Sequence, residues 1–252
     1  MTDSILFSHT GHVCRLLINC PEQHNALGRE QLEGIQRGLD QVENDPEVRV
    51  LLLTGAGEKT FCAGASLREL DATSADAVGF QLMTARVARL KVPTICLLNG
   101  DLYGGGVELA ASCDLRIGVQ GSRMRVPAAE LGLCYPLEGI YRFLECLGPA
   151  LTRRILMGAE EFDADGMLKI GFLDHLVERA DLERSAREIT ERLVSLAPLA
   201  VSAMKQIIRQ AGDYRVDPAL AETLFRRCLE SADFQEGLAA KREKRSPIFT
   251  AR

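Results

Sequence analysis

The segment Asn99-Gly-Asp-Leu-Tyr-Gly-Gly-Gly-Val-Glu-Leu-Ala110 carries the most information about the fold. It continues from an apolar run at residues 93–99 that predicts a buried β-strand, and the small and apolar residues at its end predict a helix. Three consecutive glycines, Gly104 to Gly106, stand at this junction and allow a ligand to approach the main-chain N–H groups at the positive end of the helix. The segment therefore predicts a backbone oxyanion site.

Glu108 lies three residues beyond Gly105, in a run of otherwise small and apolar residues. A carboxylate in the first turn of a helix can simply complement the helix dipole. Burial among apolar neighbours would instead raise its pKa toward the range that suits acid/base chemistry. The apolar context favours the second interpretation, which makes Glu108 the leading acid/base candidate.

A second segment of small residues, 61–67, places Ala63, Gly64 and Ala65 between Phe61 and the predicted start of a helix. Small side chains again let a ligand reach main-chain N–H groups. A tight turn between a strand and a helix explains the same pattern, and the segment alone does not separate the two interpretations.

The rest of the chain alternates strand and helix patterns in its first two-thirds and is helical in its last third. Short β-rich runs occur at residues 12–19, 48–54, 93–99 and 115–119. Apolar residues recur at helical spacing over 182–196 and again over 199–208. We expect an α/β core at residues 1–195 and a helical extension at 196–252, which packs on the core or on a neighbouring subunit.

Composition excludes several classes of protein. No apolar run of the 252 residues approaches the ~18 residues of a membrane-spanning helix, and the first residues do not resemble a secretory signal, so a cytoplasmic protein is expected. The eight cysteines are scattered and predict reduced core residues, and the four histidines lack metal-ligand spacing, so no metal site is expected. A net charge of −5 disfavours nucleic-acid binding, although residues 241–245 are locally basic.

Together, the two glycine-containing segments resemble the paired signature of the crotonase superfamily, also called the enoyl-CoA hydratase/isomerase family. The resemblance covers nearly the whole chain. It includes four stretches: Asn25-Ala26-Leu27, 93–114, which contains the second glycine segment, 171–177 and 234–249.

The resemblance implies a spiral of ββα units with a helical C-terminal region that supports trimers and dimers of trimers. It implies that the main-chain N–H groups of Ala65 and Gly105 hold the thioester oxygen of an acyl-CoA substrate. The residues that it places at the CoA and substrate site are Ala26, Leu27, Ala63, Leu67 and Gly104. Coenzyme A enters as part of the substrate, and no separate cofactor is expected.

The sequence departs from the family where hydratases carry a second glutamate. That position, after Pro127, is Ala128, which puts two-carboxylate hydration in doubt. Glu130 lies two residues further on and is expected to face elsewhere. Glu138 stands in a predicted loop from which it either reaches the acyl pocket or caps a helix as a solvated carboxylate.

Residues 132–141 resemble the methylmalonyl-CoA decarboxylase branch of the family instead. A tyrosine at the position of Tyr135 contacts the substrate carboxylate in that branch, but the branch's histidine and aspartate are replaced by Ala65 and Ser66. Tyr135 is either such a substrate contact or a packed aromatic residue whose hydroxyl bonds a nearby carbonyl group.

Three functional hypotheses follow. The first is an enoyl-CoA hydratase or isomerase that stabilises a thioester enolate and uses Glu108 as acid/base, with isomerisation simpler for a single carboxylate. The alternative is a decarboxylase of a malonyl-type CoA thioester that uses Tyr135. The third is a non-catalytic scaffold or RNA-binding protein that uses the basic residues Lys241, Arg242, Lys244 and Arg245.

Overall fold

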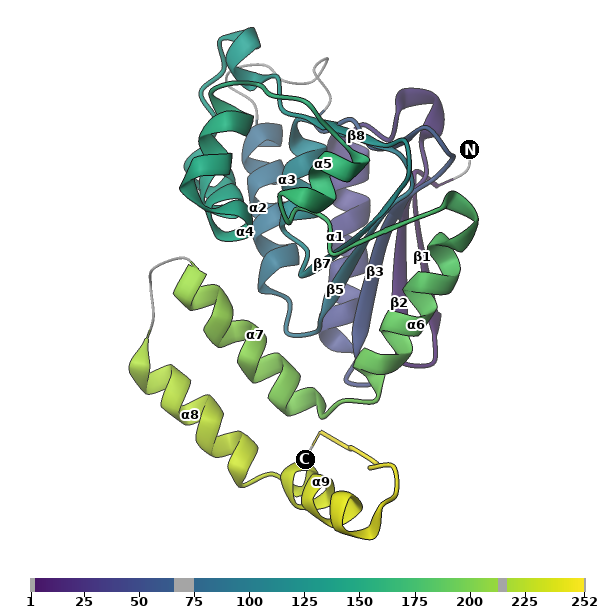
Figure 1. The fold of residues 1–252 in the computed structure, drawn as a ribbon, viewed down its shortest axis with the longest axis vertical. Helices are drawn as coiled ribbons and strands as arrows, with labels where there is room; N and C mark the ends of the chain where they lie inside the picture. Colours follow the sequence, from purple (N-terminus) through teal and green to yellow (C-terminus); the bar gives the residue numbers. More distant parts are fainter. Residues whose placement is uncertain (1–2, 66–74, 213–216, 252) are drawn as a thin grey trace.

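The computed structural model describes residues 3–65, 75–212 and 217–251, apart from the side chains of 75–78. Two sheets form its centre (Figure 1). The larger sheet has the order β1 (Ile5–Thr10), β2 (Val13–Ile18), β3 (Val50–Gly55), β5 (Thr94–Leu98), β7 (Leu115–Val119) and β10 (His175–Val177). The smaller has the order β4 (Thr60–Cys62), β6 (Asp101–Tyr103), β8 (Arg123–Arg125) and β9 (Phe162–Asp163).

The larger sheet is buried on both faces at its centre. From β2 to β10 its strands are parallel, and only β1 pairs antiparallel. Every residue of β3 and β5 is buried, as expected for parallel strands covered by helices on both sides. Along β3, Leu51 and Leu53 belong to the main core, whereas Val50 and Leu52 belong to a second apolar cluster on the opposite face.

Helices cover the two faces of this sheet. One face packs against α1 (Arg29–Asn44), whose Leu32, Ile35, Leu39 and Val42 form a buried stripe at helical spacing. The second face packs against α6 (Leu182–Val194) through Leu182, Ala186 and Ile189. The 3₁₀ turns are η1 (Pro21–Gln23), η2 (Ala128–Leu131) and η3 (Arg179–Asp181).

The chain passes repeatedly from the larger sheet to the smaller one and then into a helix. The first unit is β3, β4 and α2 (Ala75–Arg89), and the second is β5, β6 and α3 (Gly105–Ala111). The third is β7 and β8, followed by η2 and α4 (Leu137–Leu156), which contains a kink at Gly148. This repetition is the expected spiral of ββα units, and it brings the ends of β4, β6 and β8 together beside α2, α3 and α4.

The C-terminal part begins after α5 (Ala164–Lys169) and α6. It comprises α7 (Pro198–Gly212), α8 (Pro218–Leu229) and α9 (Ala232–Glu243), and α8 and α9 lie away from the sheets in Figure 1. Two cations anchor α7 to the core. Lys205 Nζ lies 2.6 Å from Asp114 Oδ2, and Arg209 donates to the carbonyl of Ala88 over 2.9 Å. A helical C-terminal region is thus present, and a domain boundary at residues 195/196 stays a prediction.

None of the helices in the described ranges is both long and apolar enough to cross a membrane.

The close approach of α3 to β4 depends on Gly106, because a Cβ atom there would overlap the main-chain carbonyl of Cys62. We expect Gly106→Ala to lower the free energy of unfolding by about 3 kcal/mol, since the backbone must move to relieve the overlap. Chemical denaturation measures the loss.

The matched control is Gly79→Ala in α2, where a Cβ would meet only Leu32 Cδ1 at 3.7 Å. That helical substitution should stabilise the fold by about 0.5–1 kcal/mol. Equal effects of the two substitutions would show that the α3–β4 contact is not specially tight.

Candidate active site

Glu108 is fully buried on α3, and its carboxylate accepts hydrogen bonds from side chains of two other segments. Thr84 on α2 donates its hydroxyl to Oε1 over 2.8 Å, and Gln81 Nε2, one turn earlier on α2, lies 3.5 Å from Oε2. The hydroxyl of Tyr135, which precedes α4, hydrogen-bonds to the same carboxylate. Three donors therefore hold one carboxylate in an otherwise apolar place.

Burial and these donors act on the pKa of Glu108 in opposite directions. Loss of solvation raises the pKa, because it penalises the anion, and this effect outweighs the lowering by Thr84, Tyr135, Gln81 and the nearby charge of Arg142. The pKa of Tyr135 is raised well above its ordinary value by burial and by the negative charge of Glu108. The phenol therefore keeps its proton at neutral pH and serves as a donor to Glu108.

The first turn of α4 also borders Glu108. A Cβ on Gly139 would lie 2.8 Å from Glu108 Oε2 and would overlap the ring of Tyr135, so only glycine fits there. The ring of Tyr135 makes an edge-to-face contact with Phe143, with centroids 5.6 Å apart. The N-terminal end of α4 thus forms a second wall of the site, beside α2.

Two main-chain N–H groups lie close together at the start of the helix that carries Glu108. Gly105 is the first residue of α3, so its N–H has no acceptor within the helix. Gly64, with φ +89°, brings the preceding segment close: a Cβ on Gly64 would lie 2.6 Å from Gly105 N, and a Cβ on Gly105 would lie 3.2 Å from Ala65 N.

The segment of Ala65 is fixed by a neighbouring loop. Leu27 N–H donates to the carbonyl of Gly64 over 2.8 Å, and Leu27 pairs with Ala65 in a parallel bridge. The Gly64 carbonyl and the Ala65 N–H belong to the same trans peptide group, so they point in opposite directions. Because the carbonyl points at Leu27, the N–H of Ala65 points away from Leu27, toward α3. A pair of convergent N–H donors is an arrangement that stabilises an oxygen atom as it gains negative charge.

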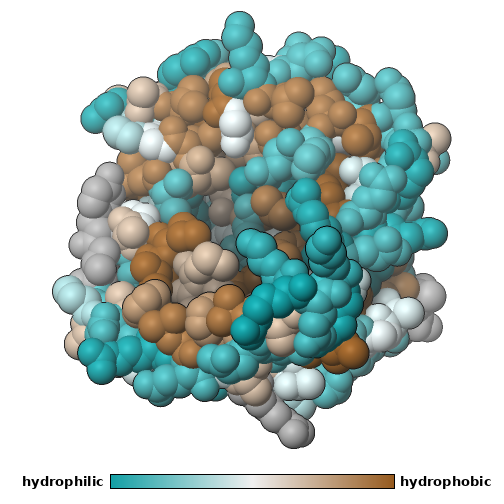
Figure 2. All heavy atoms as spheres, turned by 60° about the horizontal axis from the view of Figure 1, so that its bottom comes forward, coloured by the Kyte–Doolittle hydropathy of each residue, from teal (hydrophilic) through white to brown (hydrophobic). Residues whose placement is uncertain are grey.

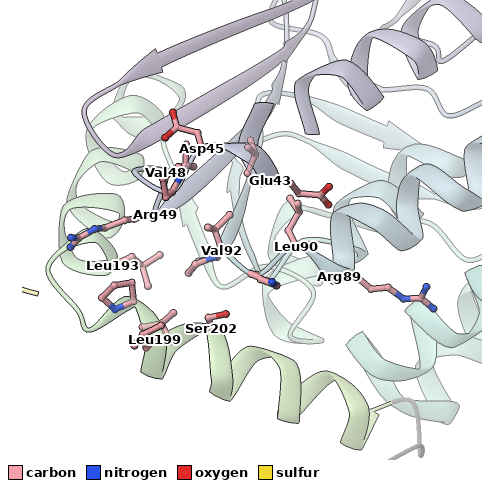
Figure 3. Close-up of a pocket in the computed structure, with 16 residues that line it drawn as sticks. Glu43, Asp45, Val48, Arg49, Arg89, Leu90, Val92, Leu193, Leu199 and Ser202 are labelled. Carbon is pink, nitrogen blue, oxygen red and sulfur yellow. The ribbon is translucent and has the colours of Figure 1, made fainter. Parts of the chain in front are cut away.

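The cavity in Figure 3 lacks this chemistry. The cavity in Figure 3, of about 500 Å³, lies between the start of β3 and α7. Apolar residues such as Val48, Val92 and Leu199 line it, with Glu43 and Arg49 among its charged residues. None of the predicted site residues is among its sixteen lining residues.

Comparison with known proteins agrees with this architecture. Residues 8–252 match the family model described as enoyl-CoA hydratase/isomerase. The chain belongs to the enoyl-CoA hydratase/isomerase family. It is 33% identical over 250 residues to a short-chain-enoyl-CoA hydratase of Clostridium acetobutylicum, covering 96% of each chain. It is 32% identical over 263 residues to a carnitinyl-CoA dehydratase of Proteus mirabilis, covering all of both chains.

Solved structures of the family share the fold. An enoyl-CoA hydratase/carnithine racemase from Magnetospirillum magneticum superposes with a TM-score of 0.91 at 28% identity, covering 100% of this chain and 97% of that one. A putative member from Hyphomonas neptunium gives 0.92 at 29% identity, covering 100% and 99%. The predicted crotonase fold is therefore confirmed.

The position of the family's second glutamate is apolar in the folded chain as well. Ala128 is buried in η2 and lines, together with Tyr135, a cavity of about 510 Å³. Glu130 faces solvent, as expected, and pairs with Arg125 over 2.5 Å. Glu138 lies in the first turn of α4 rather than in a loop, which corrects the sequence interpretation, and it is partly exposed. Its direct role stays a prediction.

The residues predicted for the CoA site come mainly from two adjacent segments. Ala26 and Ala63 are partly exposed and Leu27 is buried, and Ala63 N–H donates to the carbonyl of His24 over 3.0 Å. Gly104, with φ +50°, directly precedes α3. Leu67 lies outside the described residues, and the binding role of this set stays a prediction.

Thr84 and Gln81 are the site residues that sequence reasoning missed. They lie three residues apart on α2, beside the buried Phe80, Met83 and Val87. Two polar residues on the apolar face of a helix were a usable signal, because buried polar groups need partners.

The hydroxyl of Thr84 stabilises the anion of Glu108, so removing this donor raises the pKa of Glu108. We expect the carboxyl carbon of Glu108, followed by ¹³C NMR, to titrate at higher pH in Thr84→Val than in wild type. Thr84→Ser keeps the donor and should titrate like wild type. An unchanged titration in the valine variant would contradict the assigned hydrogen bond.

Proposed function

We propose that the chain acts on an acyl-CoA thioester as a hydratase or isomerase, with Glu108 as acid/base. The observation that carries the proposal is the position of the buried Glu108, three residues along α3 from Gly105. The main-chain N–H of Gly105 lies close to the N–H of Ala65. The relatives named as a hydratase and a dehydratase of CoA thioesters support the same substrate class.

In the proposed mechanism the thioester oxygen accepts hydrogen bonds from the N–H groups of Ala65 and Gly105. When a base removes the α-proton, or when water adds to the β-carbon, negative charge moves onto this oxygen. Two fixed donors in a dry site stabilise that charge by several kcal/mol, since the loss of one such donor costs about 3 kcal/mol. The CoA moiety would contact Ala26, Leu27, Ala63, Leu67 and Gly104, and no cofactor takes part.

Glu108 would move the proton. Its raised pKa makes it a stronger base than an ordinary glutamate, and its three donors keep the ionised form accessible. A single carboxylate is sufficient for isomerisation, since it can remove a proton at one carbon and return it at another. It is also sufficient for hydration if the proton that it takes from water is the one that it delivers to the α-carbon.

Decarboxylation of a malonyl-type CoA thioester is the second candidate, because Tyr135 lies at the site. Its hydroxyl is engaged by Glu108, however, which leaves it less suited to bind a substrate carboxylate.

The RNA-binding alternative gains little from the charges of the basic segment. Arg245 is paired with Glu236 at 2.5 Å and with Glu243 at 2.6 Å. The other three basic residues, Lys241, Arg242 and Lys244, lie next to Glu243 in the sequence.

We further propose that the chain forms a homotrimer or a dimer of trimers through its C-terminal helices. Figure 2, which brings the lower end of Figure 1 forward, shows apolar atoms gathered around a hollow on this face. Large apolar residues of α7–α9 are strongly exposed there: Met204, Ile208, Phe225, Leu229, Phe234 and Leu238. A patch of this kind favours burial against another subunit.

The activity is tested by incubating 2-enoyl, 3-enoyl and methylmalonyl thioesters of CoA with wild type and with Glu108→Gln. We expect wild type to add water to the 2-enoyl thioester or to shift the double bond of the 3-enoyl thioester. The glutamine variant should be slower by at least about a hundredfold, because it cannot exchange a proton. Mass spectrometry and chromatography of the products measure both reactions.

Loss of CO₂ from the methylmalonyl thioester that survives Glu108→Gln, but not Tyr135→Phe, would replace this function by decarboxylation. A wild-type protein that changes none of the three thioesters would contradict all acyl-CoA chemistry proposed for the site.

The assembly is tested by light scattering on the purified chain. We expect a mass of three or six times 27.6 kDa for wild type and a smaller species for Ile208→Glu, because a charge cannot be buried in the apolar contact without a partner. Leu168→Glu, an exposed leucine on α5, serves as the control and should leave the mass unchanged. A monomeric wild type would contradict the proposal.

A further inference from the structure

Gln81 has a buried oxygen that no donor among the described residues satisfies. Its Nε2 faces Glu108 Oε2 over 3.5 Å, and its Oε1 is buried without a hydrogen-bond partner in the described structure. The orientation of the amide is fixed by chemistry, because only the NH₂ end can donate to a carboxylate. Oε1 is attached to the same carbon as Nε2, so it lies in the immediate surroundings of Glu108.

An amide oxygen in this position is costly unless a ligand supplies a donor. A buried acceptor without a partner costs about 1–3 kcal/mol, and such groups call for an explanation. The nearby hydroxyls do not provide one, since those of Thr84 and Tyr135 both bond to Glu108. Gln81 Oε1 is therefore an acceptor available to a molecule that binds beside Glu108.

Hydration needs such an acceptor. A water molecule that attacks carbon gives one proton to a base, and its second O–H must be held so that its lone pair points at the carbon. Glu108 can take the first proton. The position at which family hydratases place a second carboxylate is Ala128, which offers no acceptor side chain.

We propose that Gln81 Oε1 holds the water that adds to the β-carbon of a 2-enoyl thioester. The water oxygen forms a bond to the β-carbon, and the electrons of the double bond move toward the thioester oxygen. Glu108 takes a proton from the water and delivers it to the α-carbon, which regenerates the carboxylate. In the reverse direction, Gln81 holds the hydroxyl that leaves a 3-hydroxyacyl thioester.

This inference rests on the proposed acyl-CoA function and adds a choice between its two reactions. Hydration requires a water that is held for attack on the β-carbon. Exchange of an α-proton requires only that Glu108 trade its proton with solvent, and migration of a proton requires only Glu108 itself. Gln81 is thus a water-positioning residue that favours hydration over isomerisation.

The test compares two reactions in wild type and in Gln81→Met, which keeps the length of the side chain and removes both the acceptor Oε1 and the donor Nε2. Loss of the donor acts on Glu108 in both reactions, so only loss of the acceptor distinguishes them. One is hydration of crotonyl-CoA, followed by loss of absorbance of the conjugated thioester. The other is α-hydrogen exchange of butyryl-CoA in D₂O, followed by mass spectrometry, which needs a base and the N–H donors but no addition of water. Gln120→Met, on an exposed turn after β7, is the matched control.

We expect Gln81→Met to slow hydration by about tenfold or more beyond its effect on exchange, as for loss of one hydrogen bond of about 1.4 kcal/mol. The exchange that remains shows that the variant is folded and that Glu108 works. Equal losses in both reactions, or no loss in either, would overturn the role of Gln81.

The two reactions of the wild-type protein, measured side by side, distinguish failure of this inference from failure of the proposed function. Exchange of butyryl-CoA without hydration of crotonyl-CoA would overturn the water site and leave the enolate chemistry standing. Absence of both reactions would overturn the proposed function itself.

Discussion

The first turn of α3 lies directly against the backbone of the segment that follows β4, and the rest of the site depends on this close approach. Gly64, Gly105 and Gly106 make it possible, because a side chain at any of them would overlap main-chain or ring atoms. The approach brings two N–H donors together, and the helical spacing of three residues then places Glu108 beside them. One packing constraint thus positions both the donors and the carboxylate.

The same approach buries Glu108, and burial opposes its ionisation. The fold compensates with donors rather than with a directly paired cation: Thr84 and Gln81 from α2 and the hydroxyl of Tyr135. Such donors stabilise the anion without neutralising it, so the carboxylate keeps a raised pKa and remains usable as a base. A salt bridge in this place would lower the pKa and weaken the base.

The surroundings of Glu108 come from several elements of the family fold. The chain matches the family model over residues 8–252, which includes the ββα units, the α3 junction and the segment from η2 to the first turn of α4. Tyr135 packs between Glu108, Phe143 and Gly139, and Ala128 is apolar. The polar groups around Glu108 come from α2, which supplies Thr84 and Gln81, and from Tyr135 before α4.

The sequence by itself determined the central strands, the glycine junction and the candidacy of Glu108, because apolar runs, glycines and an isolated carboxylate are local signals. It did not predict β1, an edge strand of six mostly exposed residues, or the short strands of the smaller sheet, whose two or three residues carry no periodicity. Only the tertiary structure decided which groups surround Glu108. Thr84 and Gln81 are 24 and 27 residues away from Glu108 along the chain, and nothing in local sequence fixes the packing that brings α2 against α3.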